Sequence, residues 1–375
     1  MPRLSHRTAH DNRNGRNHVN TLEHIKASRP ALAAAAAAAA VIGGLAVGAA
    51  LSADDLRLAD NPFAPAYGHE YRHGAVPTRE AKLHMDEWDR VHGASAARLR
   101  RHTVLAFGGG IDGIGVTSGT PKVYLVFYGS QWTGGGDPNG AATYLQKLFT
   151  GLGTGGEHWS GTITQYCDGP TVPRGATTCN TANTPHVGYP SAGALAGVWF
   201  DTAAPSPSSA TISQLAQEAV NAAAHFGNTT AASNRYAQYV VVSPSGTHPD
   251  GFGSANFCAW HSYTTSSYGD LPYTNMPYVT DLGASCGENF VNPGSAGLLD
   301  GFSIVNGHEY AETLTDQLPA GGWTTRSGSE NGDLCAWISS GQGAAANVSM
   351  GNGAYAMQST WSNDTSQCDI SHNIL

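Results

Sequence analysis

The sequence predicts a mixed α/β (α+β) fold, organised as a single extracellular domain that disulfides stabilise. Apolar runs at 122–132 and 235–246 predict buried strands, whereas 141–152 and 211–227 have the apolar spacing of helices. All six cysteines follow residue 160, as expected of an exported, crosslinked domain. Because strands and helices do not alternate strictly, a doubly wound sheet is not expected.

Three segments precede this domain. Residues 1–30 are a basic, cytoplasmic n-region, and residues 31–53 form an uncharged run that exceeds the roughly 20 residues needed to cross a bilayer. This run predicts a signal peptide or a transmembrane helix, with the rest of the chain outside the cytoplasm and the membrane contacted only here. Residues 54–103 contain no strand-like run, which predicts a pro-segment or a tether with one helix over 78–102.

The metal-binding or catalytic domain is expected to span 104–375. Its clearest helix, over 211–227, opens with the capping-box pair Thr211 and Gln214 and ends at Gly227. A second helix is expected over 298–319, where Pro319 ends it. Further strands are expected at 194–201, 257–265 and 276–282, with closing strands at 335–340 and 355–362.

Charge and cysteine spacing exclude two classes of function. Residues 54–375 carry 13 basic and 26 acidic groups, a net charge of −13, so nucleic acid is not an expected partner. No cysteines have C-x-x-C spacing, so a cysteine zinc site is not expected. Six cysteines permit fifteen pairings, and short local loops favour the neighbouring ones. The expected pairs are Cys167–Cys179, Cys258–Cys286 and Cys335–Cys368.

Two near-copies of one pentapeptide raise the question of a metal site: HEYRH at 69–73 and HEYAE at 308–312. The metalloprotease string H-E-x-x-H needs a helix, because only there do positions i and i+4 share a face. Prolines and glycines surround the first copy, so His69 and His73 are not expected to be ligands. The second copy lies in a predicted helix, which places His308 and Glu312 on one face.

This helix predicts a site for a divalent metal, zinc rather than calcium. His308 and Glu312 are the expected ligands, because a carboxylate can occupy a ligand position, and Glu309 is the expected general base. Glu330, 18 residues after Glu312, is the expected third ligand, and Asp333 is expected to orient a ligand. The sequence leaves three alternative donors for the third position open: Asp316, His248 and His261.

Five blocks of the chain resemble one family: PKVYLVFYGSQW, VVVSPSGTHPDGFG, FCAWHSY, SIVNGHEYAETLTD and SGSENGDLCAW. Together they are similar to a group of secreted proteins of actinobacteria and acidobacteria with the hallmark H-E-x-x-E-x-x-T-D followed by G-x-E-N-x-D-x-C-A-W. A more distant similarity is to plant EXORDIUM or phosphate-induced cell-wall proteins. The resemblance covers roughly 105–370 and implies an extracellular location. It marks the hallmark residues His308, Glu309, Glu312, Asp316, Glu330 and Asp333.

The sequence therefore predicts an exported metal-binding protein of the zincin-like metallopeptidase type, acting on a peptide or a cell-wall polymer. The alternative is a non-catalytic cell-envelope or carbohydrate-associated protein in which the acidic cluster holds a structural calcium.

Overall fold

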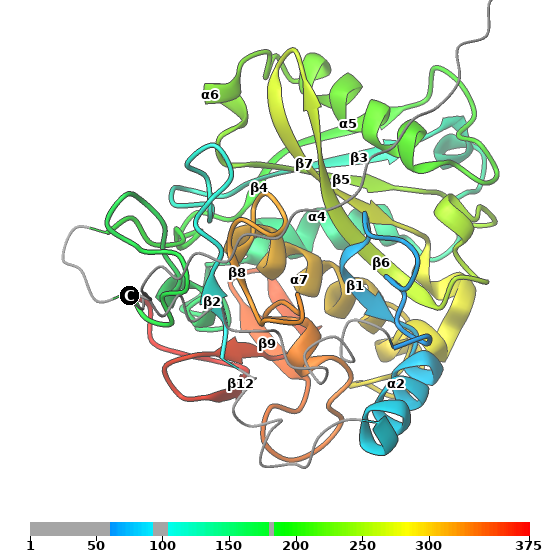
Figure 1. The fold of residues 1–375 in the computed structure, drawn as a ribbon. Helices are drawn as coiled ribbons and strands as arrows, with labels where there is room; N and C mark the ends of the chain where they lie inside the picture. Colours follow the sequence, from blue (N-terminus) through cyan, green and yellow to red (C-terminus); the bar gives the residue numbers. More distant parts are fainter. Residues whose placement is uncertain (1–60, 93–103, 180–183) are drawn as a thin grey trace, which may run out of the picture. The chain divides into compact units, whose positions relative to one another are not determined.

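The computed structural model describes residues 61–92, 104–179 and 184–375. Its centre is a six-stranded sheet with the strand order β1-β6-β7-β5-β3-β4 (Figure 1). The predicted mixed α/β class is therefore confirmed. The segments 1–30 and 31–53 lie outside the described residues. Within the described ranges, no helix is long and apolar enough to cross a membrane.

Four neighbouring strands of this sheet are parallel: β7 (Gly269–Met276), β5 (Ala237–Val242), β3 (Lys122–Tyr128) and β4 (Leu195–Asp201). β6 (Phe257–Ser266) runs antiparallel to β7, and β1 (His73–Pro77) runs antiparallel to β6. The apolar runs of β3 and β5 are buried on both faces, which is the usual pattern of central parallel strands.

Helices cover both faces of the sheet, and neighbouring residues of β5 show which helix lies where. Gln238 donates to Thr313 Oγ1 on α7 (Asp300–Thr315) at 2.9 Å. Tyr239 instead donates to Asn234 Oδ1 on α6 (Ala231–Asn234) at 2.6 Å, beside α5 (Ile212–His225). Successive side chains of a strand point to opposite faces. Thus α5 and α6 cover one face, and α7 with α4 (Ala141–Gly151) covers the other (Figure 1).

Smaller elements complete the fold. Three two-stranded ribbons pair β2 with β8, β9 with β10 and β11 with β12. Their bounds are Ala106–Phe107, Trp323–Thr324, Ala346–Met350, Gly353–Met357, Thr360–Ser362 and Gln367–Asp369. The described residues also form short 3-10 helices: η1 (Ser130–Thr133), η2 (Thr162–Gln165), η3 (Pro249–Gly251), η4 (Val279–Cys286), η5 (Gly294–Gly297) and η6 (Asp333–Cys335). The disulfides are the neighbouring pairs Cys167–Cys179, Cys258–Cys286 and Cys335–Cys368.

Two expected strands are absent, and one strand was not expected. Residues 276–282 contain only the last residue of β7 and the start of η4, because Pro277 has no N–H to continue the ladder. Residues 335–340 form no strand, since Trp337 has a φ of 59° that extended chains do not adopt. β7 itself was missed, because its Asp270 and Pro272 are poor strand residues.

The segment 54–103 also differs from expectation. The sequence predicts no strand in it, yet His73–Pro77 form β1 at the edge of the central sheet. The expected helix is α2 (Arg79–His92), which starts after Thr78, whose Oγ1 accepts from the Ala81 N–H at 3.2 Å. Residues 93–102 of that expectation lie outside the described residues. The core of the domain is therefore not confined to 104–375.

Candidate metal centre

The site begins on α7, a helix whose 16 residues are all buried. A helix buried on every side has no solvated face for polar residues, so each polar side chain on it needs a partner inside the protein. His308 Nε2 lies 3.1 Å from Glu312 Oε1, as expected for positions i and i+4. The proximity predicted from the second pentapeptide is therefore present.

A loop after β8 closes on this helical turn. Glu312 Oε1 accepts hydrogen bonds from the backbone N–H groups of Gly332 at 3.1 Å and Asp333 at 2.9 Å. A side chain at position 332 does not fit, because a Cβ there would lie 2.9 Å from both Glu312 Oε1 and His308 Nδ1. Glycine thus allows the loop to hold one oxygen of Glu312, which leaves Oε2 for another partner.

Gln358, between β10 and β11, determines which ring nitrogen of His308 carries the proton. Its Nε2 donates to the Gly332 carbonyl at 3.0 Å, so its Oε1 faces His308 Nδ1 at 3.2 Å. An amide oxygen only accepts, which makes Nδ1 the donor. In the neutral ring, Nε2 then carries a lone pair and points toward Glu312 and Asp333 Oδ1, the latter at 3.7 Å. This is the orientation that a metal-ligating imidazole needs.

The sheet contributes His261 from β6. Its register partner Thr274 accepts from Gln238 Nε2, so this row of side chains faces α7. His261 Nε2 lies 3.2 Å from Glu330 Oε1 and 3.8 Å from Glu312 Oε2. Carboxylates and imidazoles therefore alternate in one buried chain. Its order is Glu330, His261, Glu312, His308 and Asp333.

Two groups of three residues could each hold a metal ion, because in each group one ligand atom per residue lies within 4.8 Å of the other two. One consists of His308, Glu312 and Asp333, and the other of His261, Glu309 and Glu312. Zinc bonds of about 2.0–2.2 Å in a tetrahedron separate neighbouring donor atoms by about 3.3 Å. The separations of 3.1–3.8 Å along the chain fall around this value.

Several buried polar atoms of the cluster have no hydrogen-bond partner among the described residues. They are both carboxylate oxygens of Glu309, Oε2 of Glu312, Oε2 of Glu330 and Nδ1 of His261. His308 Nε2 also makes no aligned hydrogen bond, despite its closeness to Glu312. Each unpaired buried polar group costs about 1–3 kcal/mol. So many in one place indicate a missing partner.

Burial strongly shifts the protonation of the acids. It raises the pKa of Glu309 well above its ordinary value; the Glu312 and Asp333 charges add to this, and the Val76 backbone amide, which does not reach hydrogen-bonding geometry, opposes it. Burial likewise raises the pKa of Glu330, with Asp316 and Glu312 adding to the effect. The Asp333 side chain keeps 24% of its surface exposed, and burial with Glu312 beside it raises its pKa to about 7.

The two histidines shift in opposite directions. Burial lowers the pKa of His261 well below its usual value, and the nearby His73 and His308 contribute in the same direction. Burial alone would also lower the pKa of His308, but the Glu312 charge and hydrogen bond, the Asp333 charge and the Gln358 hydrogen bond together outweigh burial and raise the pKa to about 9. Without a cation, the cluster therefore keeps protons at neutral pH that a metal ion would displace.

Other predicted donors lie elsewhere. The Asp316 carboxylate caps the end of α7, where it accepts from the N–H groups of Ala320 at 2.8 Å and Gly322 at 2.5 Å. His248 precedes η3, and its Nδ1 lies 3.1 Å from the Phe252 carbonyl oxygen. Neither residue belongs to the two metal-capable groups.

The first pentapeptide forms no helix, as expected: its residues make a turn and the start of β1. Its last residue, His73, nevertheless pairs in register with His261. Sequence reasoning missed three residues of the site, Gln358, Gly332 and Gly74. Gly332 lies in the SENGD block between the expected site residues Glu330 and Asp333, but nothing local shows that its backbone must approach Glu312 and His308; for Gln358 no local signal existed.

In comparisons with protein-family models, curated proteins and solved structures, none matches this chain. The resemblance drawn from the sequence blocks remains a prediction.

Proposed function

We propose that the protein is a metal-dependent hydrolase of the zincin-like peptidase type. His308 and Glu312 on the helix α7 and His261 on the strand β6 would hold a divalent cation. Glu330, which is 3.2 Å from His261 Nε2, supplies the remaining carboxylate. The proposal keeps the ligands expected from the sequence and moves His261 from an alternative donor to a ligand.

One observation supports this proposal: buried acid and imidazole atoms without a hydrogen-bond partner lie in two overlapping metal-capable groups that share Glu312, with Glu330 beside them. Buried carboxylates repel one another, and their charge is costly in an apolar surrounding. A cation removes both penalties, because it neutralises the acids and serves as the partner of the orphaned atoms. Exposed carboxylates would not indicate a cation in this way, since water would hydrogen-bond to them and screen their charges.

The donor types favour zinc. Calcium binds oxygen ligands and has no use for imidazole, whereas zinc binds histidine nitrogen and carboxylate oxygen alike. Two histidines, each with its Nε2 within 3.8 Å of Glu312, therefore argue against the structural calcium of the alternative reading. That alternative, a non-catalytic carbohydrate-associated protein, gains no specific support from the site.

Glu309 is the residue proposed to move a proton. It neighbours both proposed α7 ligands, and neither of its carboxylate oxygens has a hydrogen-bond partner among the described residues. A bound zinc ion would supply Lewis acidity to a substrate carbonyl and lower the pKa of water nearby. The positive charge of such an ion would also lower the pKa of Glu309, so that its carboxylate would be ionised and could accept a proton from water.

Metal analysis of the purified chain tests this proposal. We expect about one equivalent of zinc per chain, removal of the metal by a chelator, and restoration by zinc but not by calcium. Cleavage of labelled casein and of quenched fluorescent peptides is then assayed with the intact chain and with a segment-released chain, in which a protease cut after residue 95 frees residues 61–92. A chain that binds no transition metal overturns the site, and a zinc-loaded, segment-released chain that cleaves no peptide overturns the hydrolase.

A further inference from the structure

Strand β1 lies directly over the cluster. A Cβ atom on Gly74 would come within 1.8 Å of Glu312 Oε2 and 2.7 Å of His261 Nε2, so the Gly74 backbone itself faces these two donors. β1 also packs against α7, and its partner in the sheet is β6, the strand that carries His261 (Figure 1). These three features show that β1 is the edge strand that covers the proposed metal site.

Without β1, strand β6 would be the edge of the sheet. Its N–H and C=O groups would be unpaired, and an extended chain could add to them as a further strand. β1 runs antiparallel to β6, with His73 opposite His261 and Pro77 opposite Phe257. A polypeptide bound here would thus pass its backbone over Glu309 and Glu312 in an extended conformation.

We propose that the edge of β6 is the substrate groove, that it takes an extended polypeptide, and that residues 61–92 occupy it as an internal inhibitor. The inference rests on the proposed function, since it names the substrate class of the same site. The residue that faces Glu312 is expected to be glycine, because even a Cβ atom does not fit in the space above Glu312 Oε2.

The segment is held at one end by a buried ion pair. Arg72 is 5% exposed; its Nε donates to Asp250 Oδ2 at 2.8 Å, and its guanidinium lies over the Phe257 ring at 4.9 Å. Tyr71 donates to the other oxygen of Asp250 at 2.9 Å. These contacts lie outside the metal cluster, so they can be altered without touching a ligand.

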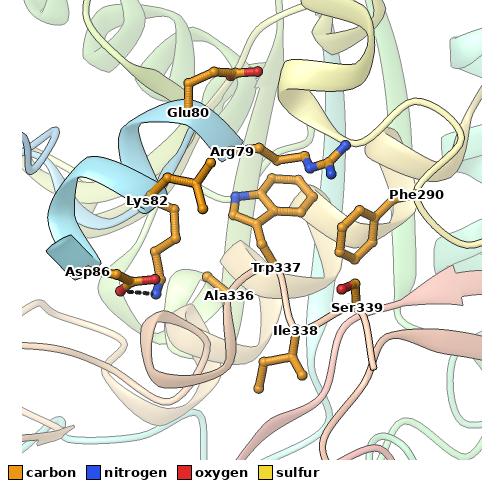
Figure 2. A pocket seen from close by; sticks show the side chains of 10 residues that line it. Arg79, Glu80, Lys82, Asp86, Phe290, Ala336, Trp337, Ile338 and Ser339 are labelled. Atoms are coloured by element: carbon orange, nitrogen blue, oxygen red, sulfur yellow. Dashed lines mark hydrogen bonds and ion pairs between the residues drawn. The ribbon is translucent and has the colours of Figure 1, made fainter. Parts of the chain in front are cut away.

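The other end is attached loosely. Only Ala81 of α2 is buried, and Leu83 is 70% exposed. A hollow of about 400 Å³ lies between α2 and the loop around Trp337. Figure 2 shows Arg79 and Lys82 of α2 among the side chains that line it. The Trp337 indole N–H donates to the Pro77 carbonyl at 2.7 Å, where β1 ends. An element with few buried contacts opens at low free energy, so α2 is suited to leaving.

The test uses the full chain with a site-specific protease sequence inserted between residues 95 and 96. It is made in the wild-type background, with Arg72→Ala to weaken the anchor, and with Arg90→Ala as a control, because among the described residues Arg90 pairs with Glu87 on the exposed face of α2. Amide hydrogen exchange of 257–261 is measured before and after cutting. This readout needs neither bound metal nor hydrolysis, so it stays informative if the proposed function fails.

After cutting, we expect the Arg72→Ala chain to exchange its β6 amides at least about tenfold faster than the uncut chain. A chelator should remove zinc faster by a similar factor, and the uncut Arg90→Ala chain should behave as wild type. A synthetic peptide of residues 69–80 should restore protection in trans, whereas the same peptide with Gly74→Val should not.

Unchanged exchange of 257–261 in the cut Arg72→Ala chain would show that β1 is a permanent strand and would overturn the inference. Equal protection by the Gly74→Val peptide would overturn the glycine requirement. If Arg72→Ala does not fold, an uncut Gly74→Val chain replaces it, since the added side chain must displace β1 from Glu312. Release of the segment without any peptide cleavage would leave the groove intact and refute only the hydrolase.

Discussion

The two pentapeptides HEYRH and HEYAE differ in one chemically important position, yet they lie in opposite environments. HEYRH matches the metalloprotease string in full, and it forms a turn with Glu70 exposed and the first residue of a strand. HEYAE departs from the string at Glu312, and it lies on a helix where all five residues are buried. The helix, and not the match of letters, brings donor atoms together.

Burial also changes what the same residue type does. Glu70 and Glu309 hold the same place in the two pentapeptides, but Glu70 is exposed, whereas burial raises the pKa of Glu309 well above its usual value. The comparison teaches that a motif acquires chemistry from its desolvation and its neighbours. The first copy contributes in a different way, because it continues into the strand that covers the second.

The largest effect is expected for Glu309→Gln. The amide keeps the shape of the side chain but cannot accept a proton, so peptide hydrolysis should fall by about 10²–10⁴-fold. Zinc content should stay near wild type, because Glu309 is not a proposed ligand. Turnover and zinc stoichiometry are measured on the same segment-released preparation. Loss of zinc in this variant would make Glu309 a ligand and would remove its assignment as base.

Glu312→Gln should weaken zinc binding by more than about 100-fold, beyond the 10–100-fold typical of residues that only support a ligand. The amide oxygen can still accept from the Gly332 and Asp333 N–H groups, so the loop should stay in place. Competition with a chromogenic chelator measures the affinity, and near-ultraviolet circular dichroism checks the packing. Unaltered affinity would contradict the central place of Glu312.

Gln358→Met should lower zinc affinity by about 10–100-fold, because His308 Nδ1 loses the acceptor that fixes its proton. The residue acts through His308, so the pH dependence of binding should change together with the affinity. Titrations at several pH values separate this effect from a general loss of packing, which would lower the melting temperature and leave the pH profile unchanged.

Zinc affinity should rise with pH between about 5 and 8. Asp333, with its pKa raised to about 7, and His308, with its pKa raised to about 9, hold protons in the metal-free cluster that the ion must displace. Each displaced proton contributes up to about tenfold in affinity per pH unit. Calorimetry in two buffers of different ionisation enthalpy counts the released protons. Binding that is independent of pH, without proton release, would disagree with buried protonated ligands.

The smallest effect is expected for Glu70→Gln, the counterpart of Glu309→Gln in the first pentapeptide. Glu70 is exposed and outside the cluster, so zinc content and turnover should match wild type. The free energy of unfolding should stay within about 0.5 kcal/mol of wild type. A marked loss of zinc here would break the comparison between the two copies.

Local signals explain what the sequence predicted well. The capping box of Thr211 and Gln214 placed the start of α5, and the apolar runs of β3 and β5 placed the centre of the sheet. His308 and Glu312 were brought together correctly, because one helical turn fixes their distance. These features depend only on residues close in sequence.

Long-range pairing explains what the sequence missed. β1 contains Gly74 and Pro77, which disfavour strands, and its hydrogen bonds come from distant β6. His261 faces α7 because of the register between β6 and β7, which no local pattern reveals. For the same reason it could be suggested only as one alternative donor among several. Gln358 reaches His308 only because β10 and β11 bring it there.

The disulfide Cys258–Cys286 joins the first half of β6 to the end of η4, next to the stretch that β1 covers. A strand stripped of one neighbour ordinarily frays at its ends. Here the disulfide fixes Cys258, so the residues that follow it as far as His261 are expected to stay extended. If the covering segment leaves, a substrate polypeptide could therefore pair with β6 in place of β1, and β6 would not have to unfold and refold between the two.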